Sequence, residues 1–180
     1  TKTTEEQRTT FLARVFQDPK LGTAPRMTVA ENMLLASKRG EKRHLMPRRL
    51  KQRMAEFTKL AAQMNNGLEN RMTTPTGALS GGQRQALSFL MATLKRPDIL
   101  LLDEHTAALD PHTARNLLHA TNQRITEDHL TALMITHHME DALKYGNRLI
   151  VLKDGQIKAD YNAAEKAQLT VDDLYAYFEM

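Results

Sequence analysis

The chain has 180 residues, a formal net charge of +4 and no cysteine. This length suits one domain with a buried core, and the absence of cysteine fits a reducing compartment. The longest aliphatic run, Ile99 to Leu102, is far shorter than the roughly 20 residues that a membrane-spanning helix needs. No charged and then apolar leader opens the chain, so we expect no secretion signal.

A short strand is expected near the start of the chain. The first ten residues are polar, and an apolar stretch runs from Leu12 to Phe16. It ends at Gln17, and Asp18-Pro19 follows as a turn. Taken alone, Gln17 is best interpreted as a solvated amide at the end of a strand.

Two helices are expected between Gly22 and Asn66. Thr28 and Glu31 have the spacing of a capping box, which predicts a helix from there through about Arg39. The second helix has apolar residues that alternate spacings of four and three: Leu50, Met54, Phe57, Ala61 and Met64. Such a helix packs one face into a small helical subdomain.

A basic run lies between Lys38 and Arg53, with eight basic residues and one acid, Glu41. It fits either a patch for nucleic acid or anionic lipid, or a solvated helix face. Aromatic residues are not interleaved with it before Phe57. We therefore interpret the run as a solvated face and expect no nucleic-acid partner.

The stretch from Gly77 to Asp110 reads as a loop, a helix, a strand and a charged strand end. Ser80 is a good N-cap and Gln83 completes a capping box. The helix carries an apolar stripe of Leu87, Leu90, Met91 and Leu94 and stops before Pro97. Ile99 to Leu102 then suits a strand buried on both faces of a parallel sheet. Such a strand delivers Asp103 and Glu104 to the carboxyl edge of the sheet, where a metal ion or a polarised water would bind.

The remainder of the chain continues the alternation of helices and strands. Asp110-Pro111 predicts the start of a helix that runs to about Thr126. The expected elements after it are a strand from Leu130 to Thr136 that ends at His137, a helix from about Glu140 to Gly146, a strand from Arg148 to Leu152, a two-residue turn at Asp154-Gly155 and a final helix from Val171 to Met180. The histidines do not follow a metal-binding spacing such as H-E-x-x-H.

Three of these segments together resemble ABC-type ATPases. Leu79 to Gln83 is similar to the signature motif, Leu100 to Glu104 to the Walker B strand, and Ala108 to Asp110 to the D-loop. Each match alone is weak, but the three stand in the family's order within thirty-odd residues. Gln17 then resembles the glutamine of the Q-loop, and His137 resembles the switch histidine.

The resemblance implies an α/β fold, namely a partial P-loop NTPase of the ABC type with a parallel-sheet core. A helical subdomain would be inserted between the Q-loop and the signature motif. We expect a single domain over residues 1–180, with residues 1–19 and 96–180 in the sheet core and 20–95 in the helical subdomain with its signature helix.

The phosphate-binding loop of the family is missing. Only Gly77 and Gly82 have Walker A spacing, and Gln83-Arg84 follows them in place of Lys and Ser or Thr. The 180 residues thus lack the cradle and the lysine that hold the β- and γ-phosphates. We expect an N-terminally truncated domain that is inactive alone.

The resemblance also implies the ligands, ATP and Mg²⁺, and a role for each site residue. Asp103 and Gln17 would hold Mg²⁺, Glu104 would polarise the attacking water and His137 would contact the γ-phosphate. A nucleotide bound mainly by the opposite subunit would be contacted by the signature residues Ser80, Gly81, Gly82 and Gln83. Asp110 would lie at the seam of the resulting dimer.

The partners implied are a second nucleotide-binding subunit, integral membrane permease subunits and a substrate-binding lipoprotein. His105, which stands where the family usually has proline, together with Gly22 to Pro25 resembles a subset of bacterial importers. The protein would then be cytoplasmic and peripheral on the inner face of the membrane. Two alternatives remain open: a soluble ABC ATPase that acts on the ribosome or DNA, and a non-catalytic ABC-like binding module.

Overall fold

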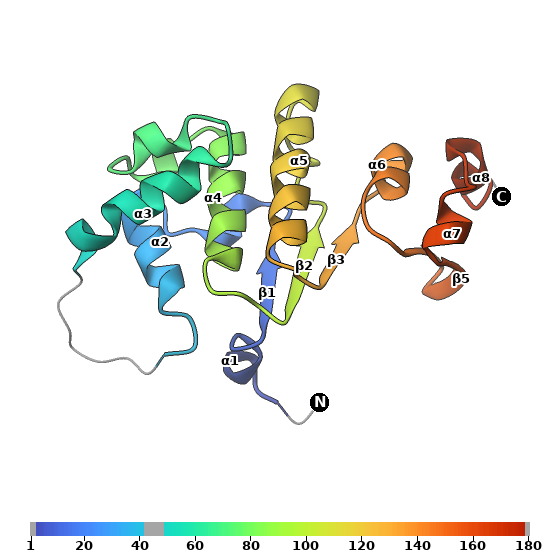
Figure 1. Cartoon of the computed structure of the whole chain (residues 1–180), viewed down its shortest axis with the longest axis horizontal. Coiled ribbons are helices and arrows are strands. Elements are labelled where there is room, and N and C mark those ends of the chain that lie inside the picture. The colour runs from blue at the N-terminus through green and yellow to red at the C-terminus, as the bar shows by residue number, and fades with distance from the viewer. Residues whose placement is uncertain (1–2, 42–48, 179–180) are drawn as a thin grey trace. The chain divides into compact units, whose positions relative to one another are not determined.

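The computed structural model describes residues 3–41 and 49–178, which form two compact units, Thr1–Met134 and Ile135–Met180. The first unit contains α1 (Glu5–Arg8), β1 (Leu12–Val15), the 3₁₀ helix η1 (Pro19–Gly22), α2 (Val29–Ser37), α3 (Leu50–Ala62), the 3₁₀ helices η2 (Leu68–Arg71) and η3 (Thr76–Ala78), α4 (Gly81–Thr93), β2 (Ile99–Asp103), α5 (Pro111–Glu127) and most of β3 (Ala132–Ile135). Figure 1 shows β1 and β2 side by side although more than eighty residues separate them.

The sheet of the first unit has the strand order β1-β2-β3. β1 pairs with β2 in parallel, and the register sets Val15 beside Leu102. One face of this sheet is buried, since Ala13, Val15, Leu100 and Leu102 belong to the same core as apolar residues of α2, α4 and α5. The two strands therefore end together at one edge, which carries the polar residues that follow them.

The other face of the sheet is only partly covered, which corrects the expectation of a strand buried on both faces. Burial alternates along β2, where Leu101 is half-buried. In β3, Leu133 is 57% exposed and Ile135 is 61% exposed. Parallel sheets normally have both faces covered, so the described residues supply one layer of helices where this arrangement usually has two.

The predicted helix starts are confirmed by their caps. The side chains of Thr28, Ser80 and Asp110 each accept a hydrogen bond from the backbone N–H three residues on. The reciprocal capping-box bond is formed by Glu31 for the first and by Gln83 for the second. Each cap satisfies N–H groups that the helix itself leaves without a partner.

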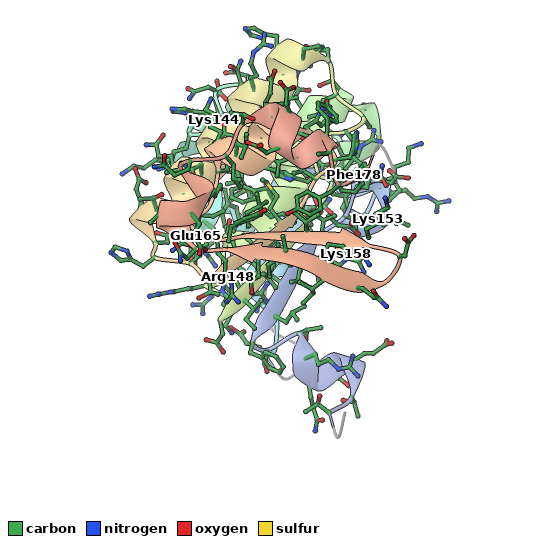
Figure 2. The ribbon with its side chains drawn as sticks, turned by 90° about the vertical axis from the view of Figure 1, so that its right-hand side faces the viewer. Lys144, Arg148, Lys153, Lys158, Glu165 and Phe178 are labelled. Atoms are coloured by element: carbon green, nitrogen blue, oxygen red, sulfur yellow. The ribbon has the colours of Figure 1, made fainter. Side chains whose placement is uncertain are left out.

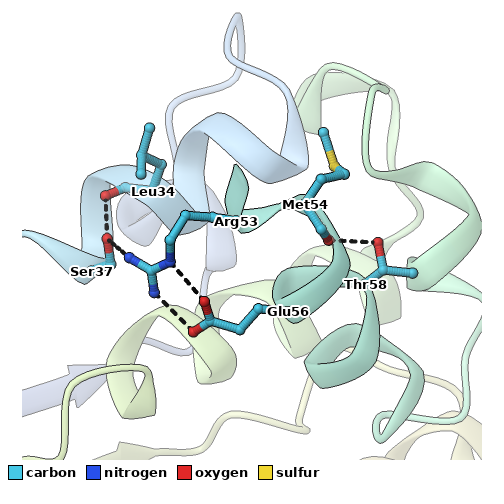
Figure 3. Close-up of polar contacts among 6 residues, drawn as sticks. All are labelled: Leu34, Ser37, Arg53, Met54, Glu56 and Thr58. Carbon is cyan, nitrogen blue, oxygen red and sulfur yellow. Dashed lines mark hydrogen bonds and ion pairs between the residues drawn. The ribbon is translucent and has the colours of Figure 1, made fainter. Parts of the chain in front are cut away.

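The basic run is described only in part, because residues 42–48 lie outside the described residues. Figure 3 shows that Arg53 of α3 contacts Glu56 on its own helix and the Ser37 hydroxyl at the end of α2. Arg39 donates to the carbonyls of Ala92 and Lys95 at the end of α4. These basic side chains serve structural contacts within the helical part of the unit.

The described part of the second unit is a hairpin with three short helices. Its elements are α6 (Met139–Lys144), β4 (Leu149–Lys153), β5 (Gln156–Tyr161), α7 (Ala163–Lys166) and α8 (Val171–Tyr175). Asp154 and Gly155 both have positive φ, as the predicted two-residue turn requires. α8 ends at Tyr175 and is shorter than predicted, and the last two residues of the predicted helix, 179–180, lie outside the described residues.

Polar contacts hold this unit together. Figure 2 shows Arg148 at one end of the hairpin, with Lys153 and Lys158 toward the turn. Arg148 pairs with Asp160 across the two strands, and the buried Lys166 donates to the carbonyls of Tyr145 and Gly146. Within the described residues, no helix is long and apolar enough to cross a membrane.

Candidate nucleotide site

The carboxyl ends of β1 and β2 bring three of the predicted site residues together. The Gln17 amide Nε2 donates to Glu104 Oε2 at 3.2 Å. Asp103 is the last residue of β2 and directly precedes Glu104. The parallel register explains this geometry, because it places the residues that follow Val15 beside those that follow Leu102. The edge of the sheet thus holds two carboxylates and one amide, as expected.

Arg14 was not predicted and takes part in this cluster. Its guanidinium lies 2.5 Å from Asp103 Oδ2 and 4.7 Å from the centre of the Phe16 ring. Both charged side chains are partly exposed, so solvent and salt weaken the pair. The available signal in the sequence was a charged residue between Ala13 and Val15, the two buried positions of the strand. Arg14 balances the charge of Asp103 in this structure.

Glu104 adopts an unusual backbone conformation. Its φ is +43°, in the left-handed region that non-glycine residues enter at an energetic cost. The next residue, His105, is 2% exposed and its Nε2 has no hydrogen-bond partner among the described residues. Burial lowers the pKa of His105 to about 4, so the imidazole is neutral at pH 7. A buried neutral ring therefore anchors the turn that carries Glu104.

The start of α4 separates into exposed and buried positions. Ser80 and Gly81 are exposed, and a Cβ added to Gly81 would meet only Leu109, at an ordinary 3.7 Å. Gly82 is buried, and a Cβ there would lie 2.4 Å from the Thr113 side chain of α5. Two backbone amides at a helix N-terminus beside an exposed hydroxyl suit an anion such as phosphate. Gly82 is also required for the close approach of α4 and α5.

Gln83 has structural contacts on both ends of its amide. Its Oε1 accepts from the Ser80 backbone N–H at 3.3 Å, and its Nε2 donates to the Asn66 carbonyl at 3.2 Å. The amide thus joins the start of α4 to the loop after α3. Its predicted contact with a nucleotide stays a prediction.

Asp110 caps α5 and is exposed. Hydrogen bonds from the side chain and backbone of Thr113 lower the pKa of this carboxyl. Beside it, a hollow of about 210 Å³ opens between the end of α3 and the first turns of α5. The residues that line it are Met64, Asn65, Asn66, His112, Thr113, Asn116 and Leu117.

His137 belongs to the second unit and is exposed. Its ring lies 4.4 Å from the ring of His138, measured between centroids. The His138 backbone N–H donates to the Thr136 hydroxyl at 3.0 Å, which shapes the turn after β3. The predicted contact of His137 with the γ-phosphate stays a prediction.

Gln85 is the second residue that sequence reasoning missed. It is 1% exposed, and its Nε2 donates to the Phe16 carbonyl at 2.9 Å. The signal available was a glutamine two residues after the signature segment, within a helix that becomes apolar. It connects α4 directly to the residue before Gln17.

The residues present fit part of a nucleotide and metal site. Mg²⁺ prefers oxygen ligands and usually takes one or two carboxylates, which matches Asp103 at the sheet edge beside Gln17. Three or more clustered His, Asp or Glu side chains are not found among the described residues, so ligands from phosphate or water would have to complete the coordination. Gly81 is exposed at the start of α4, where backbone amides suit an anion. A lysine in a Gly-rich cradle is not part of the 180 residues.

Comparison with known proteins decides the family. The sequence profile of the ABC transporter family matches residues 1–107. The chain belongs to this family. It is 42% identical over 179 residues to a tyrosine transport ATP-binding protein of Clostridioides difficile (strain R20291), covering 99% of this chain and 71% of that relative.

More distant members of the ABC transporter family cover less of the chain. It is 32% identical over 146 residues to the thiamine import ATP-binding protein ThiQ of Escherichia coli (strain K12), which covers 81% of this chain and 59% of ThiQ. The chain thus spans little more than half the length of that relative. It also matches a phosphonates import ATP-binding protein, PhnC 2 of Cupriavidus metallidurans, at 32% identity over 153 residues.

Solved ABC cassettes share the fold. The dimeric ATP-binding cassette MJ0796 in a post-hydrolysis state bound to ADP and Pi has a TM-score of 0.71, 24% identity and coverage of 90% of this chain and 68% of that chain. A second dimeric structure of MJ0796, described as a bacterial ABC transporter cassette, has a TM-score of 0.67, 27% identity and coverage of 87% and 64%. The predicted α/β fold of the P-loop NTPase class is confirmed.

Proposed function

We propose that this chain is part of the ATP-binding and hydrolysing subunit of a bacterial ABC importer. The observation that carries the proposal is the hydrogen bond between Gln17 and Glu104, because it joins the Q-loop to the acidic end of the Walker B strand. Relatives whose names include tyrosine transport, thiamine import and phosphonates import support the importer class. A non-catalytic module would have no need for a carboxylate held beside a strand-end glutamine.

Each site residue has a chemical task in this proposal. ATP would supply the phosphoryl group, and Asp103 and Gln17 would hold Mg²⁺, which would neutralise negative charge there. Glu104 accepts a hydrogen bond from the attacking water and orients it. Arg14 pairs with Asp103 and balances its charge.

The other site residues act across a dimer in this proposal. Two copies face each other with two-fold symmetry, so that Ser80, Gly81 and Gly82 of one copy meet the phosphates held by the other. Gln83 supports this turn, Asp110 lies at the seam between copies, and His137 contacts the γ-phosphate. The dimeric cassettes that share the fold support this arrangement.

A permease surface fits the turn that follows Gln17. Leu21 is 72% exposed in η1, and Leu35 is 58% exposed in α2. Both aliphatic side chains are accessible to a partner protein. We place the permease on the surface around Leu21 to Arg49, with the subunit on the cytoplasmic face of the membrane. A substrate-binding lipoprotein would deliver the cargo, and tyrosine is the first cargo to test because of the relative's name.

The hydrolytic assignment is tested by Glu104→Gln in the full-length protein. We expect a loss of steady-state phosphate release of at least about 100-fold, since the amide cannot act as a base. ATP should then hold the variant as a dimer that elutes as such in size-exclusion chromatography. Glu127→Gln, near the end of α5, serves as a matched control and should turn over normally. Normal turnover of Glu104→Gln would refute the assignment.

The docking surface is tested by Leu21→Glu and Arg49→Glu in the complete transporter. Each change should weaken co-purification with the permease more than it slows basal ATP hydrolysis, because it alters the docking surface and not the nucleotide site. Lys59→Glu reverses an exposed charge on α3. It should change neither co-purification with the permease nor basal ATP hydrolysis. Basal hydrolysis that falls as much as assembly would place the permease elsewhere.

A further inference from the structure

A buried glutamine ties the signature helix to the turn that carries Gln17. Gln85 is 1% exposed, and its Nε2 donates to the Phe16 carbonyl at 2.9 Å. Burying an amide in an apolar helix face costs free energy unless the amide is hydrogen-bonded. The buried Gln85 amide therefore depends on its bond to the Phe16 carbonyl. This carbonyl belongs to the peptide group that directly precedes Gln17.

The far end of the same turn packs closely against α4. A Cβ added to Gly22 would lie 2.8 Å from the Ser88 hydroxyl and 3.9 Å from the Phe16 ring. Ser88 is buried on α4, one turn after Gln85. The segment Phe16–Gly22, which we name the Q-turn, is therefore held against α4 at both of its ends.

The Q-turn touches the catalytic edge and the exposed docking surface. Gln17 donates to Glu104 at 3.2 Å, while Leu21 in the same turn is 72% exposed. On α4, the exposed Ser80 precedes Gln85 by five residues, or about 7.5 Å along a helix that transmits displacement as a rigid rod. Helix start, Q-turn and Glu104 thus form one connected path of described contacts.

We propose that Gln85 is a positioning residue that makes the signature helix and the Q-turn move as one body, and thereby sets Glu104 through Gln17. A shift of the Q-turn by a partner at Leu21 would be passed to α4 through Gln85 and Ser88. The same shift would be passed to Glu104 through the Gln17 amide. The expected effect on kcat rests on the proposed ATP hydrolysis. The link between α4 and the Q-turn does not depend on that function.

The link is tested first by Gln85→Met in the full-length protein. The thioether fills the space of the amide and cannot donate to Phe16. We expect kcat to fall about tenfold with the KM for ATP changed less than about twofold, because misplacement of a catalytic group affects the chemical step. Backbone hydrogen exchange of residues 16–22 should speed up by at least about tenfold, since the turn is released.

A double-mutant cycle separates positioning from mere stability. If Gln85 acts through Gln17, Gln85→Met should have little further effect on kcat in a Gln17→Ala background. Thr93→Val is the matched control, because Thr93 is also a buried polar residue of α4 but bonds only to its own helix. It should leave both kcat and the exchange of residues 16–22 unchanged.

The contact at Gly22 allows a rescue experiment. Gly22→Ala places a methyl group against the Ser88 hydroxyl and should reproduce the fall in kcat and the faster exchange. Ser88→Ala removes that oxygen, so the double variant should recover both readouts. Failure of the rescue, additive effects of Gln85→Met and Gln17→Ala, or unchanged exchange in Gln85→Met would each overturn the proposal. If the unaltered full-length protein hydrolyses no ATP, the proposed function fails, and the exchange measurements alone decide the link.

Discussion

At the scale of single residues, the burial of His105 stabilises the strained backbone of Glu104. A non-glycine residue in the left-handed region costs about 1–3 kcal/mol and persists only where its surroundings hold it. Glu104 has a φ of +43°, and the next side chain, His105, is fully enclosed. The family usually has a proline after the acid, which restricts the backbone directly. Here the burial of an imidazole has the same restraining effect on the turn.

This arrangement predicts an acid-labile fold. The pKa of His105 is about 4 in the folded protein, whereas the ordinary pKa of an exposed histidine is 6.5. Between these two pH values the unfolded chain binds more protons, so the free energy of unfolding falls as the pH falls from 6.5 to 4. From 6.5 down to the lower test pH of about 4.5, at about 1.4 kcal/mol per pH unit, the expected loss is about 2.5 kcal/mol. Urea titrations of the full-length protein at pH 7 and pH 4.5, in metal-free buffer, measure it.

The contribution of His105 is isolated by substitution. His105→Leu should reduce the difference in unfolding free energy between the two pH values by most of that amount, because leucine fills the cavity and does not titrate. His119→Gln removes an exposed histidine of α5 and should leave the pH dependence as it was. Equal pH dependence in the unaltered protein and His105→Leu would mean that folding does not lower the pKa of His105.

At the scale of elements, the helices could be predicted from the sequence because their signals are local. Thr28, Ser80 and Asp110 cap helices within three residues of themselves, so their neighbours in the sequence are enough. The burial of a strand depends on residues far away in the chain. The sequence predicts Leu101 and Leu133 as core residues, but Leu101 is half-buried and Leu133 is exposed. The aliphatic run correctly predicts a strand that enters the core. It does not show which faces of the sheet are covered by helices.

The candidate site shows the same division. Asp103 and Glu104 were predicted at the carboxyl edge because they directly follow a strand of an open α/β sheet. Gln17 was assigned to the same site by the family resemblance alone, and its amide is hydrogen-bonded to Glu104. Arg14 and Gln85 were missed because their roles depend on tertiary contacts, across the sheet for Arg14 and from helix to strand end for Gln85. Periodicity shows which face of an element a side chain occupies, but not its partner.

The basic run predicts an absence of nucleic-acid binding. Arg39 and Arg53 are held by contacts within the helical part of the unit, so they are not arranged to follow a phosphate backbone. We expect no salt-dependent binding of duplex DNA or RNA to the full-length protein at about 0.15 M salt. Fluorescence anisotropy with labelled duplexes from about 0.05 to 0.2 M salt measures this. A steep fall in affinity with added salt would reveal released counterions and a real basic interface.

At the scale of the whole molecule, the chain carries the acidic edge and the signature helix but not the phosphate cradle. Catalysis of phosphoryl transfer consists of positioning and electrostatic stabilisation. Glu104 can polarise water only if a phosphate is held opposite it. Leu133 and Ile135 are exposed, because the described residues cover this parallel sheet with helices on one face only and leave apolar surface in water.

The 180-residue chain alone should therefore bind and hydrolyse ATP barely or not at all, and it should aggregate readily. An upstream segment with a GxxxxGK[ST] loop, its strand and its helix should restore turnover and solubility together, because the same segment supplies the lysine and covers the sheet face. The short and the extended chains are compared in three measurements. Calorimetry with ATP and Mg²⁺ gives the ATP affinity, phosphate release gives the turnover, and light scattering gives the extent of aggregation. An extended chain with alanine for the Walker A lysine is the matched control, and it should be soluble but inactive. Micromolar ATP affinity with steady turnover in the 180-residue chain would show that its own residues hold the phosphates without such a loop.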